Sequence, residues 1–464
     1  MRDRQILISP FTYTAIVGLE VDSAINEHAK ATVELMISDD NVSYYRALLQ
    51  KETWVNVQLT DETGKQKALF EGLVINFMLK EGYHETLLRL ELISGTFLMD
   101  LKPHFRTFQD ATLPYRAVHE IVSAGYEDHH FLYPADSGKA VDHLVIQHRE
   151  TDWELLKRLA AEVDEVLTVH SRMKGIRYFI GLPEGKERPI EADSDVHVQI
   201  DYAEVLEKQQ NGRPDITVAD CQAVRFDSRE LYELGDRVTY FDHRYIIYKI
   251  ASRYQGAELI HSYYFKAVKG LPQLAKGLPS SAGASFEATV TAIYRDKVKV
   301  DVTNDENGNQ PERKWFAYAS VYSSPDGSGW YTMPEIGDRV MLYVPEREAD
   351  TFVISAVHRE TEGGRLNPDH KSFKNCYGKE LLLTPDRLLL TNNNGMKIEL
   401  SDREGIIIES DKDISILAAG DLAVTSQTAS LTIAAKERVA VTQGKTTMTL
   451  SDDISFDGGQ FRMQ

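Results

Sequence analysis

Three carboxylates lie close together in the sequence, at Glu150, Asp152 and Glu154. Paired carboxylates can act as general acid and general base, so this group is the first place to look for a hydrolytic site. Thr151 and Glu154 also fit the S/T-x-x-E capping box, and acidic side chains at a helix start meet free N–H groups and the positive end of the helix dipole. That second explanation needs no catalysis, and we expect these carboxylates to belong to a helix start.

A second group with chemical potential is Asp128, His129 and His130, to which His143 or His148 could add a ligand. Imidazole and carboxylate groups are common metal ligands, although adjacent histidines in a polar loop are more often solvated. The sequence has no G-x-S-x-G, H-E-x-x-H, Walker-type or paired C-x-x-C pattern. We therefore predict no catalytic, cofactor-binding or metal-binding residues and a protein that is not an enzyme, with a metal at His129 and His130 left as an alternative.

Composition points to a soluble, folded chain of several domains. The 464 residues are 42% hydrophobic and 27% charged, and they exceed the size of one ordinary core. No run of about eighteen apolar residues is present, and we expect the N-terminus to form a strand, not an export signal. Cys221 and Cys376 lie far apart and are expected to be free thiols. The net charge of −19, with no Lys/Arg run, argues against nucleic acid as a partner.

Stepping along the chain, composition changes mark three regions. We predict a mixed α/β region over 1–269, a Gly/Pro/Ser-rich linker over 270–285, a small all-β domain over 286–358, a second polar linker over 359–378 and a β-repeat over 379–464.

In the first region, alternating apolar residues predict strands, and two apolar stripes predict helices. The expected strands cover residues 31–38, 55–59, 68–80, 87–93, 166–170, 178–181, 237–240, 245–252 and 258–268. The first helix starts near Pro114 and ends at Gly125, with Ala117, Val118, Ile121 and Val122 on its apolar face. The second helix begins at the capping box, and its buried stripe is expected to be Leu155, Leu156, Leu159, Ala160 and Val163.

The middle region has the strand content of a small barrel of the oligonucleotide/oligosaccharide-binding (OB) type. Alternation at 286–292 and 298–302, a Gly337-Asp338 turn into 340–344, and a closing run at 352–357 give about five strands. Trp315 and Trp330 are expected to pack inside this barrel. An OB fold does not imply nucleic-acid binding, and the acidic chain speaks against it.

In the C-terminal region, short alternations of apolar residues recur every eight or nine residues, and polar residues lie between them. The apolar residues that mark this repeat are Ile398, Ile407, Ile416, Val424, Ile433, Val441 and Leu450. Segments such as 405–410, 431–433 and 448–450 favour strands. One copy of such strands cannot enclose a core and leaves open edges. We therefore predict an intertwined, triple-stranded β-helix made by three chains.

Three passages carry a resemblance to a known family. The first is residues 147–160, QHRETDWELLKRLA, which look like the helix after the first barrel of a hub. The second is residues 328–342, SGWYTMPEIGDRVML, which look like an OB signature with a Gly-Trp strand. The third is the β-repeat, which follows in the expected order. Together they resemble VgrG-like spike proteins of contractile injection systems, which include type VI secretion, phage hub–spike and extracellular particles.

The resemblance implies a mainly β, multi-domain homotrimer: a barrel-like hub of two subdomains with short helices, an OB barrel and a needle. Implied partners are an Hcp-like tail tube, baseplate proteins, a PAAR-like tip protein and effector cargo, without a cofactor. It also implies assembly in the bacterial cytoplasm and delivery out of the cell, or into a target, when the machine contracts. The family's enzymatic domains have no counterpart, because 359–378 is too short for one.

The last residues of the chain are expected to form the end of the needle. No His-x-His pair occurs in residues 454–464, so we expect Phe456, Phe461 and Met463 to need a separate cap. Alternatives are a trimeric tail fibre or adhesin that binds a receptor, and a cell-wall hydrolase.

Overall fold

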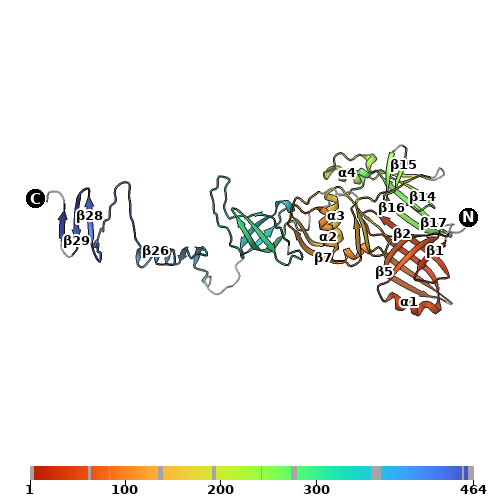
Figure 1. Ribbon diagram of the computed structural model, residues 1–464, viewed down its shortest axis with the longest axis horizontal. Coiled ribbons are helices and arrows are strands. Elements are labelled where there is room, and N and C mark those ends of the chain that lie inside the picture. The colour runs from red at the N-terminus through yellow and green to blue at the C-terminus, as the bar shows by residue number, and fades with distance from the viewer. Residues whose placement is uncertain are drawn as a thin grey trace. The chain divides into compact units, whose positions relative to one another are not determined.

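The computed structural model describes residues 5–60, 64–82, 84–133, 139–190, 195–241, 243–272, 280–308, 310–356, 367–451 and the backbone of 454–457. The chain divides into two compact units, Met1–Arg359 and Glu360–Gln464 (Figure 1). In the first unit we call residues 5–272 the hub region and 280–356 the barrel region; the second is the C-terminal unit. The fold is mainly β with short helices and several folded parts, as predicted.

The hub region is built on one twelve-stranded sheet. Its first half follows the order β1 (Gln5–Ser9), β4 (Trp54–Thr60), β5 (Gln66–Glu81), β6 (Glu85–Ile93), β3 (Lys30–Ser38) and β2 (Ala15–Ala24). The second half continues with β16 (His243–Gln255), β17 (Glu258–Lys266), β14 (Ala223–Ser228) and β13 (His197–Gln199), and β15 (Arg237–Tyr240) joins β16 to β12 (Glu187–Arg188). The antiparallel β2–β16 pair, with Val21 opposite Ser252, connects the two halves.

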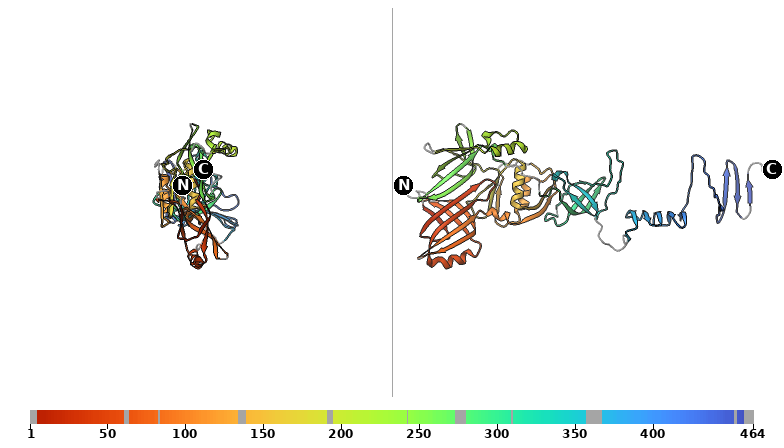
Figure 2. Two further views of the ribbon diagram at one scale, coloured as in Figure 1. Left: turned by 90° about the vertical axis from the view of Figure 1, so that its right-hand side faces the viewer. Right: turned by 180° about the vertical axis from the view of Figure 1, so that it is seen from behind.

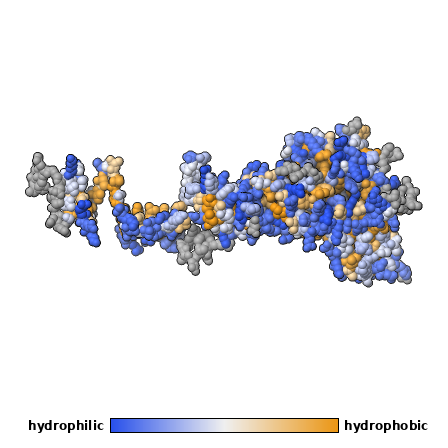
Figure 3. Space-filling view, viewed as in Figure 1, coloured by the Kyte–Doolittle hydropathy of each residue, from blue (hydrophilic) through white to orange (hydrophobic). Residues whose placement is uncertain are grey.

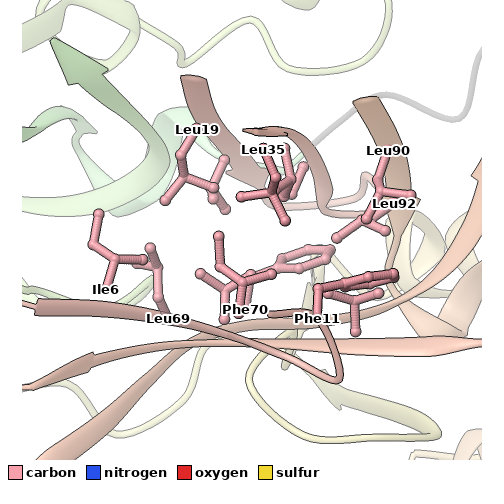
Figure 4. Close-up of a cluster of buried hydrophobic side chains, with 14 of the residues drawn as sticks. Ile6, Phe11, Leu19, Leu35, Leu69, Phe70, Leu90 and Leu92 are labelled. Carbon is pink, nitrogen blue, oxygen red and sulfur yellow. The ribbon is translucent and has the colours of Figure 1, made fainter. Parts of the chain in front are cut away.

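Alternation of apolar and polar residues places each half-sheet on its own core. In β3, Ala31, Val33, Leu35 and Ile37 are buried while the residues between them are half-buried, as the alternation predicts. Figure 4 shows Ile6, Leu19, Leu35, Phe70 and Leu90 meeting in the first core. A second core under the other half contains Phe226, Ile247, Tyr263 and Phe265.

Two helices and a small sheet form a third core. They are α2 (Tyr115–Ser123), α3 (Asp152–Glu162), β8 (His129–Leu132), β10 (Leu167–Val169) and β11 (Ile176–Ile180). The predicted capping box of α3 is present: Glu154 N–H donates to the Thr151 hydroxyl, and Thr151 N–H donates to the Glu154 carboxylate. Figure 2, from behind, shows the yellow segment with α3 between the hub sheet and the barrel region.

The apolar face predicted for the first helix is wrong in part. Ile121 is exposed, whereas His119 is buried beside Val118 and Val122. Three helices were not predicted: α1 (Val42–Leu49), α4 (Tyr202–Gln210) and α5 (Val218–Cys221). These helices have eight, nine and four residues, which are too few turns for a helical period to stand out in the sequence.

The barrel region contains five strands whose order closes on itself. Its sheet follows β20 (Phe316–Ala317), β19 (Lys297–Val302), β18 (Ser285–Tyr294), β21 (Arg339–Tyr343) and β22 (Phe352–Ala356). A parallel bridge between Tyr318 and Val353 joins the first strand to the last. Val298, Val300 and Val302 point into the interior, as their alternation predicts.

The tryptophans and the hub boundary differ from expectation. Trp330 is 59% exposed and Trp315 is partly exposed, so the prediction that both pack inside the barrel is wrong. The barrel core also includes Leu144 and Ile146, which come from the hub region. The barrel region therefore shares its core with the hub region, and both lie within one compact unit.

The C-terminal unit is a run of short antiparallel strands. One sheet follows β23 (Lys371–Lys374), β24 (Glu380–Thr384), β25 (Arg387–Thr391), β26 (Met396–Ser401) and β27 (Gly405–Ser410); another follows β28 (Val439–Gln443), β29 (Thr446–Leu450) and β30 (Ile454–Asp457). β23 lies inside the stretch predicted as a linker. Residues 411–438, all of them described, contain no strand, so the strand expected at 431–433 is absent from the single chain.

Candidate assembly interface and the hub–barrel junction

The sheet β23–β27 has one face made almost entirely of large aliphatic side chains. In an antiparallel sheet, residues directly opposite each other point to the same side. Leu381 pairs with Leu390, which pairs with Ile398, which in turn pairs with Ile408. A second row runs alongside, and together the two rows form what we call the apolar face: Leu381, Leu383, Leu388, Leu390, Ile398, Leu400, Ile406 and Ile408.

Every side chain of the apolar face is exposed in the single chain; Leu390 is 51% exposed and Ile406 is 73% exposed. Figure 3 shows the corresponding row of orange residues along the segment labelled β26 in Figure 1. A contiguous apolar surface of this kind marks a site of association, because leaving it in water loses the hydrophobic free energy of burial.

The opposite face of the same sheet is arranged around a buried carboxylate. Glu399 lies opposite Leu389 and Ile407, and it forms ion pairs with Arg387 at 3.3 Å and with Lys397 at 3.4 Å. Ile407 therefore shares a face with charged groups, while its neighbours Ile406 and Ile408 lie on the apolar face. The predicted placement of Ile407 in line with Ile398 is wrong, because a strand side chain changes face at every residue.

Residues 411–438 also carry regularly spaced apolar side chains, although they form no paired strands. Apolar residues recur in i, i+2 pairs at Ile414/Ile416, Leu422/Val424 and Leu431/Ile433, and each pair follows the last by eight or nine residues. All six side chains are exposed. Residues at i and i+2 of an extended chain lie on one side, so this segment also presents an apolar edge with no covering partner among the described residues.

The first unit contains a buried ionic junction between the hub and barrel regions. Glu348 of the barrel is buried and accepts a hydrogen bond from Ile146 N–H at 3.2 Å and from the Ser281 hydroxyl at 2.8 Å. Its other oxygen pairs with Arg158 of α3 at 3.2 Å, and Arg158 also pairs with Glu150 at 2.9 Å. The charge of each buried group is thereby matched, which is the condition for burying it.

A second set of contacts attaches the barrel loop after β19 to strand β7 (Pro103–Phe108). The Asp305 carboxylate accepts hydrogen bonds from Thr107 N–H at 3.0 Å and from the Thr107 hydroxyl at 2.5 Å. Glu306 N–H donates to Phe105 O at 3.0 Å, and the Glu306 carboxylate receives His104 at 2.7 Å. β7 in turn pairs with β9 (Val145–Thr151). The barrel is thus held at both its Glu348 side and its β19 loop.

The carboxylates of Glu150, Asp152 and Glu154 have separate structural partners. Glu154 completes the cap of α3, and Glu150 pairs with Arg158. Asp152 is buried, pairs with Arg106 and accepts a 2.8 Å hydrogen bond from the Tyr126 hydroxyl. Burial and this bond to the carboxylate raise the pKa of Tyr126. These contacts account for all three groups by ion pairing and helix capping.

The histidines considered as metal ligands do not converge. His129 Nδ1 contacts Tyr126 O at 2.6 Å, Asp128 pairs with Arg177, and His143 contacts Asp142 at 3.1 Å. His148 instead lies against Phe105 and Phe286 in the junction, where burial lowers its pKa. Within the described ranges no group of three or more His, Cys, Asp or Glu residues is placed to hold a metal ion.

The remaining predictions concern the two cysteines, membrane-spanning helices and the end of the chain. Cys221 is buried and Cys376 is exposed, and no disulfide joins these two residues. In the described parts of the chain, no helix is long and apolar enough to span a membrane. Phe456, Phe461 and Met463, expected near a needle tip, lie outside the residues whose side chains the structure describes. Sequence reasoning missed Arg158 and Glu348, because each has charged neighbours in the sequence, Lys157 beside Arg158 and Arg347 beside Glu348, and no local signal sets either residue apart.

Comparison with known proteins agrees with this architecture. Residues 22–229 match the family model of the phage tail baseplate hub (GPD). No curated protein matches the sequence. The predicted resemblance to VgrG-like spike proteins is confirmed by the hub match and by the folds of solved relatives.

Two solved structures illustrate the shared fold. One is the E. coli c3393 protein, a component of the type VI secretion system that is structurally similar to the bacteriophage T4 tail proteins gp27 and gp5. Its TM-score with this chain is 0.55 at 12% sequence identity, and the match covers 76% of this chain and 100% of that one. The lidded Francisella PdpA–VgrG complex also has a TM-score of 0.55, at 9% identity, covering 85% of this chain and 76% of that one. The chain therefore shares the fold of these hub and spike proteins.

Proposed function

We propose that the protein is the hub–spike subunit of a contractile injection machine and acts as a homotrimer that is structural, not enzymatic. The single observation that carries this proposal is the apolar face of β23–β27, which is exposed in one chain. It occurs together with a hub match over residues 22–229. A fibre or adhesin would need the C-terminal strands but not this hub.

Three copies of the C-terminal unit would cover the apolar side chains that a single copy leaves exposed to water. The sheet has a single apolar face and a charged opposite face centred on Glu399, so it needs a partner on one side only. Around a three-fold axis, the apolar faces turn inward and the Arg387–Glu399–Lys397 groups remain outside. The unpaired edge of residues 411–438 finds hydrogen-bonding partners in neighbouring chains, which also removes an aggregation-prone edge.

The first unit is suited to carry such a spike. An assembly that is driven into a target must transmit an axial load from hub to spike without hinging between them. The Arg158–Glu348 pair and the Asp305–Thr107 contacts cross between the hub and barrel regions, and the two regions share core residues. In this proposal the barrel region is the OB-type domain, supported by its five-strand order and the Tyr318–Val353 closure.

The remaining partners follow from the proposed role. The hub would contact an Hcp-like tail tube and baseplate proteins, and the needle end would take a PAAR-like tip protein and effector cargo. Assembly would take place in the bacterial cytoplasm, and the particle would be delivered out of the cell or into a target on contraction. The charge of −19 per chain keeps a trimer soluble before assembly.

The direct test is electron microscopy of the purified full-length chain combined with mass photometry. We expect a trimer mass and particles with a three-fold hub bearing a thin needle. A monomer mass at micromolar concentration would contradict the proposal. A peptidoglycan-release assay on the same sample separates the hydrolase alternative, which predicts activity from the chain alone.

A further inference from the structure

Asparagine followed by glycine occurs three times in the chain, at Asn211-Gly212, Asn307-Gly308 and Asn394-Gly395. In such a pair the backbone nitrogen of glycine can attack the side-chain carbonyl carbon of asparagine, because glycine has no side chain to shield that nitrogen. Whether the reaction takes place in a folded protein depends on the hydrogen bonds that hold the two reacting groups. The three pairs differ in those bonds.

Two of the pairs are held in unreactive arrangements. Gly308 N–H, which carries the attacking nitrogen of the second pair, donates to Asp305 O at 3.1 Å. The side-chain amide of Asn211 donates to Glu207 O at 2.7 Å, where Asn211 is the C-terminal cap of α4. Attack in either pair must first break one of these bonds by local unfolding, which slows the reaction.

The third pair lies in the turn between β25 and β26, and both of its residues are exposed. Asn394 bonds to Asn392 through its backbone: its N–H donates to the Asn392 side-chain oxygen at 2.8 Å, and its C=O accepts from the Asn392 amide at 3.2 Å. In the described part of the chain, no hydrogen bond holds the Asn394 side chain or the Gly395 N–H. The two reacting groups are therefore available to each other in the folded chain.

The same turn favours glycine at position 395. Gly395 has a φ of +85°, and a Cβ placed there would lie 2.6 Å from the carboxylate carbon of Asp411. Gly395 O also accepts a hydrogen bond from Asp411 N–H at 3.0 Å. A residue with a side chain would shield the attacking nitrogen, but the backbone conformation disfavours one. The fold thus keeps a reactive dipeptide in an exposed turn.

We propose that Asn394 is a site of spontaneous covalent modification, at which the chain converts asparagine to aspartate and isoaspartate. The Gly395 nitrogen gives up its proton and attacks the Asn394 side-chain carbonyl carbon, and ammonia leaves, which closes a cyclic succinimide. Water then opens the ring at either of its two carbonyl groups. Overall, a water molecule is consumed and ammonia is released, and nothing is oxidised or reduced.

Both products change the C-terminal unit at the turn that joins β25 to β26. Each product adds a carboxylate close to Asp411, and like charges at short distance repel. Isoaspartate also routes the backbone through the former side chain, which lengthens the turn by a methylene group. Because Leu390 on β25 lies opposite Ile398 on β26, a longer turn would disturb the pairing that builds the apolar face.

The test is ageing of the full-length chain in mildly alkaline buffer, followed by peptide mapping with mass spectrometry. Chromatography separates the aspartate and isoaspartate peptides, which have equal mass. In the folded protein we expect conversion at Asn394 to run well ahead of conversion at Asn211 and Asn307. The control is the same chain in denaturant, which removes the protecting hydrogen bonds, so the three sites should convert at comparable rates. Asn394→Gln, whose longer side chain cyclises slowly, should lose the modification and keep the fold.

Equal conversion at the three sites in the folded protein, or faster conversion at Asn211 or Asn307, would overturn the inference. The inference uses contacts within one chain and is independent of the proposed homotrimer. Mass photometry of the same samples separates the two proposals. A trimer mass with unreacted Asn394 would overturn the modification site and leave the proposed function standing. A monomer mass with converted Asn394 would support the site and contradict the proposed function.

Discussion

Arg158 on α3 and Glu348 in the barrel form an ion pair at 3.2 Å although 190 residues separate them in the sequence. Desolvation alone would lower the pKa of Arg158, but Glu348 and Glu150 outweigh it and raise that pKa further above its ordinary value. Arg158 therefore stays charged, and its ion pair with Glu348 fixes the barrel region against the helix that begins with the capping box.

Breaking this pair from one side should be costly. In Arg158→Ala, the buried Glu348 carboxylate loses its cation, and we expect the free energy of unfolding to fall by about 3–5 kcal/mol. Chemical denaturation followed by tryptophan fluorescence measures the change. The control is Arg347→Ala, since Arg347 is largely exposed and pairs only with the neighbouring Asp350; it should cost at most about 1 kcal/mol. Equal losses in both variants would contradict the role of the junction.

The two faces of β27 should respond differently to the same substitution. Ile408→Ser removes an aliphatic side chain from the apolar face, and burial of one such side chain is worth roughly 1.5–3 kcal/mol per copy. We expect the trimer to dissociate at higher concentration than the unmodified protein in mass photometry. Ile407→Ser lies on the Glu399 face and should leave the dissociation midpoint nearly unchanged. The reverse order of effects would mean that the sheet is covered from the other side.

The carboxylates at the start of α3 should differ in their contribution to stability. Asp152→Ala leaves Arg106 without its buried partner, so we expect a loss of about 3–5 kcal/mol. Glu154→Ala removes half of an exposed capping box and should cost about 1 kcal/mol. Thermal and denaturant unfolding of both variants measures the difference. A small effect of Asp152→Ala would contradict the structural account of this residue.

Stability should fall with acid through His119. Burial lowers the pKa of His119 to about 3, so the folded state holds the neutral ring while the unfolded state takes up a proton below about 6.5. The folded state is then penalised by about 1.4 kcal/mol per pH unit as the pH falls from 6 to 4. Unfolding titrations at several pH values should show a shallower slope of stability against pH for His119→Gln than for the unmodified protein.

A steeper or unchanged slope in His119→Gln would show that other groups dominate acid sensitivity in this pH range. Any loss of the 3.4 Å contact between His119 and the Tyr178 hydroxyl changes stability at all pH values, so it shifts the curve without altering its slope.

Periodicity predicted the parts of the fold in which one residue type alternates with another. The strands containing Val33 and Val300 and the Thr151–Glu154 cap follow from local patterns, and the structure has them. Ile407 could not be placed because three consecutive isoleucines fit either face, and only the pairing with Glu399 decides. Trp330 was misplaced because hydrophobicity alone does not show which large apolar side chains a fold leaves exposed.

Local sequence patterns could not predict the Arg158–Glu348 junction, for a different reason. Arg158 and Glu348 acquire their meaning only when a helix and a barrel come together from distant sequence positions, and a single charge has no periodicity. The same applies to Leu144 and Ile146, whose apolar character predicts burial but not which core receives them.

Sharing Leu144 and Ile146 with the barrel core also limits how this chain can be recombined. A chimera cut in the 270–285 stretch would transplant the barrel without the two side chains that fill its interior, leaving a cavity there and two bare aliphatic residues on the donor hub. Exchange of C-terminal units between related proteins is therefore better made beyond Ala356, near the boundary between the two compact units. A crossover at that point keeps the hub and barrel regions together and leaves the C-terminal unit as the exchangeable part.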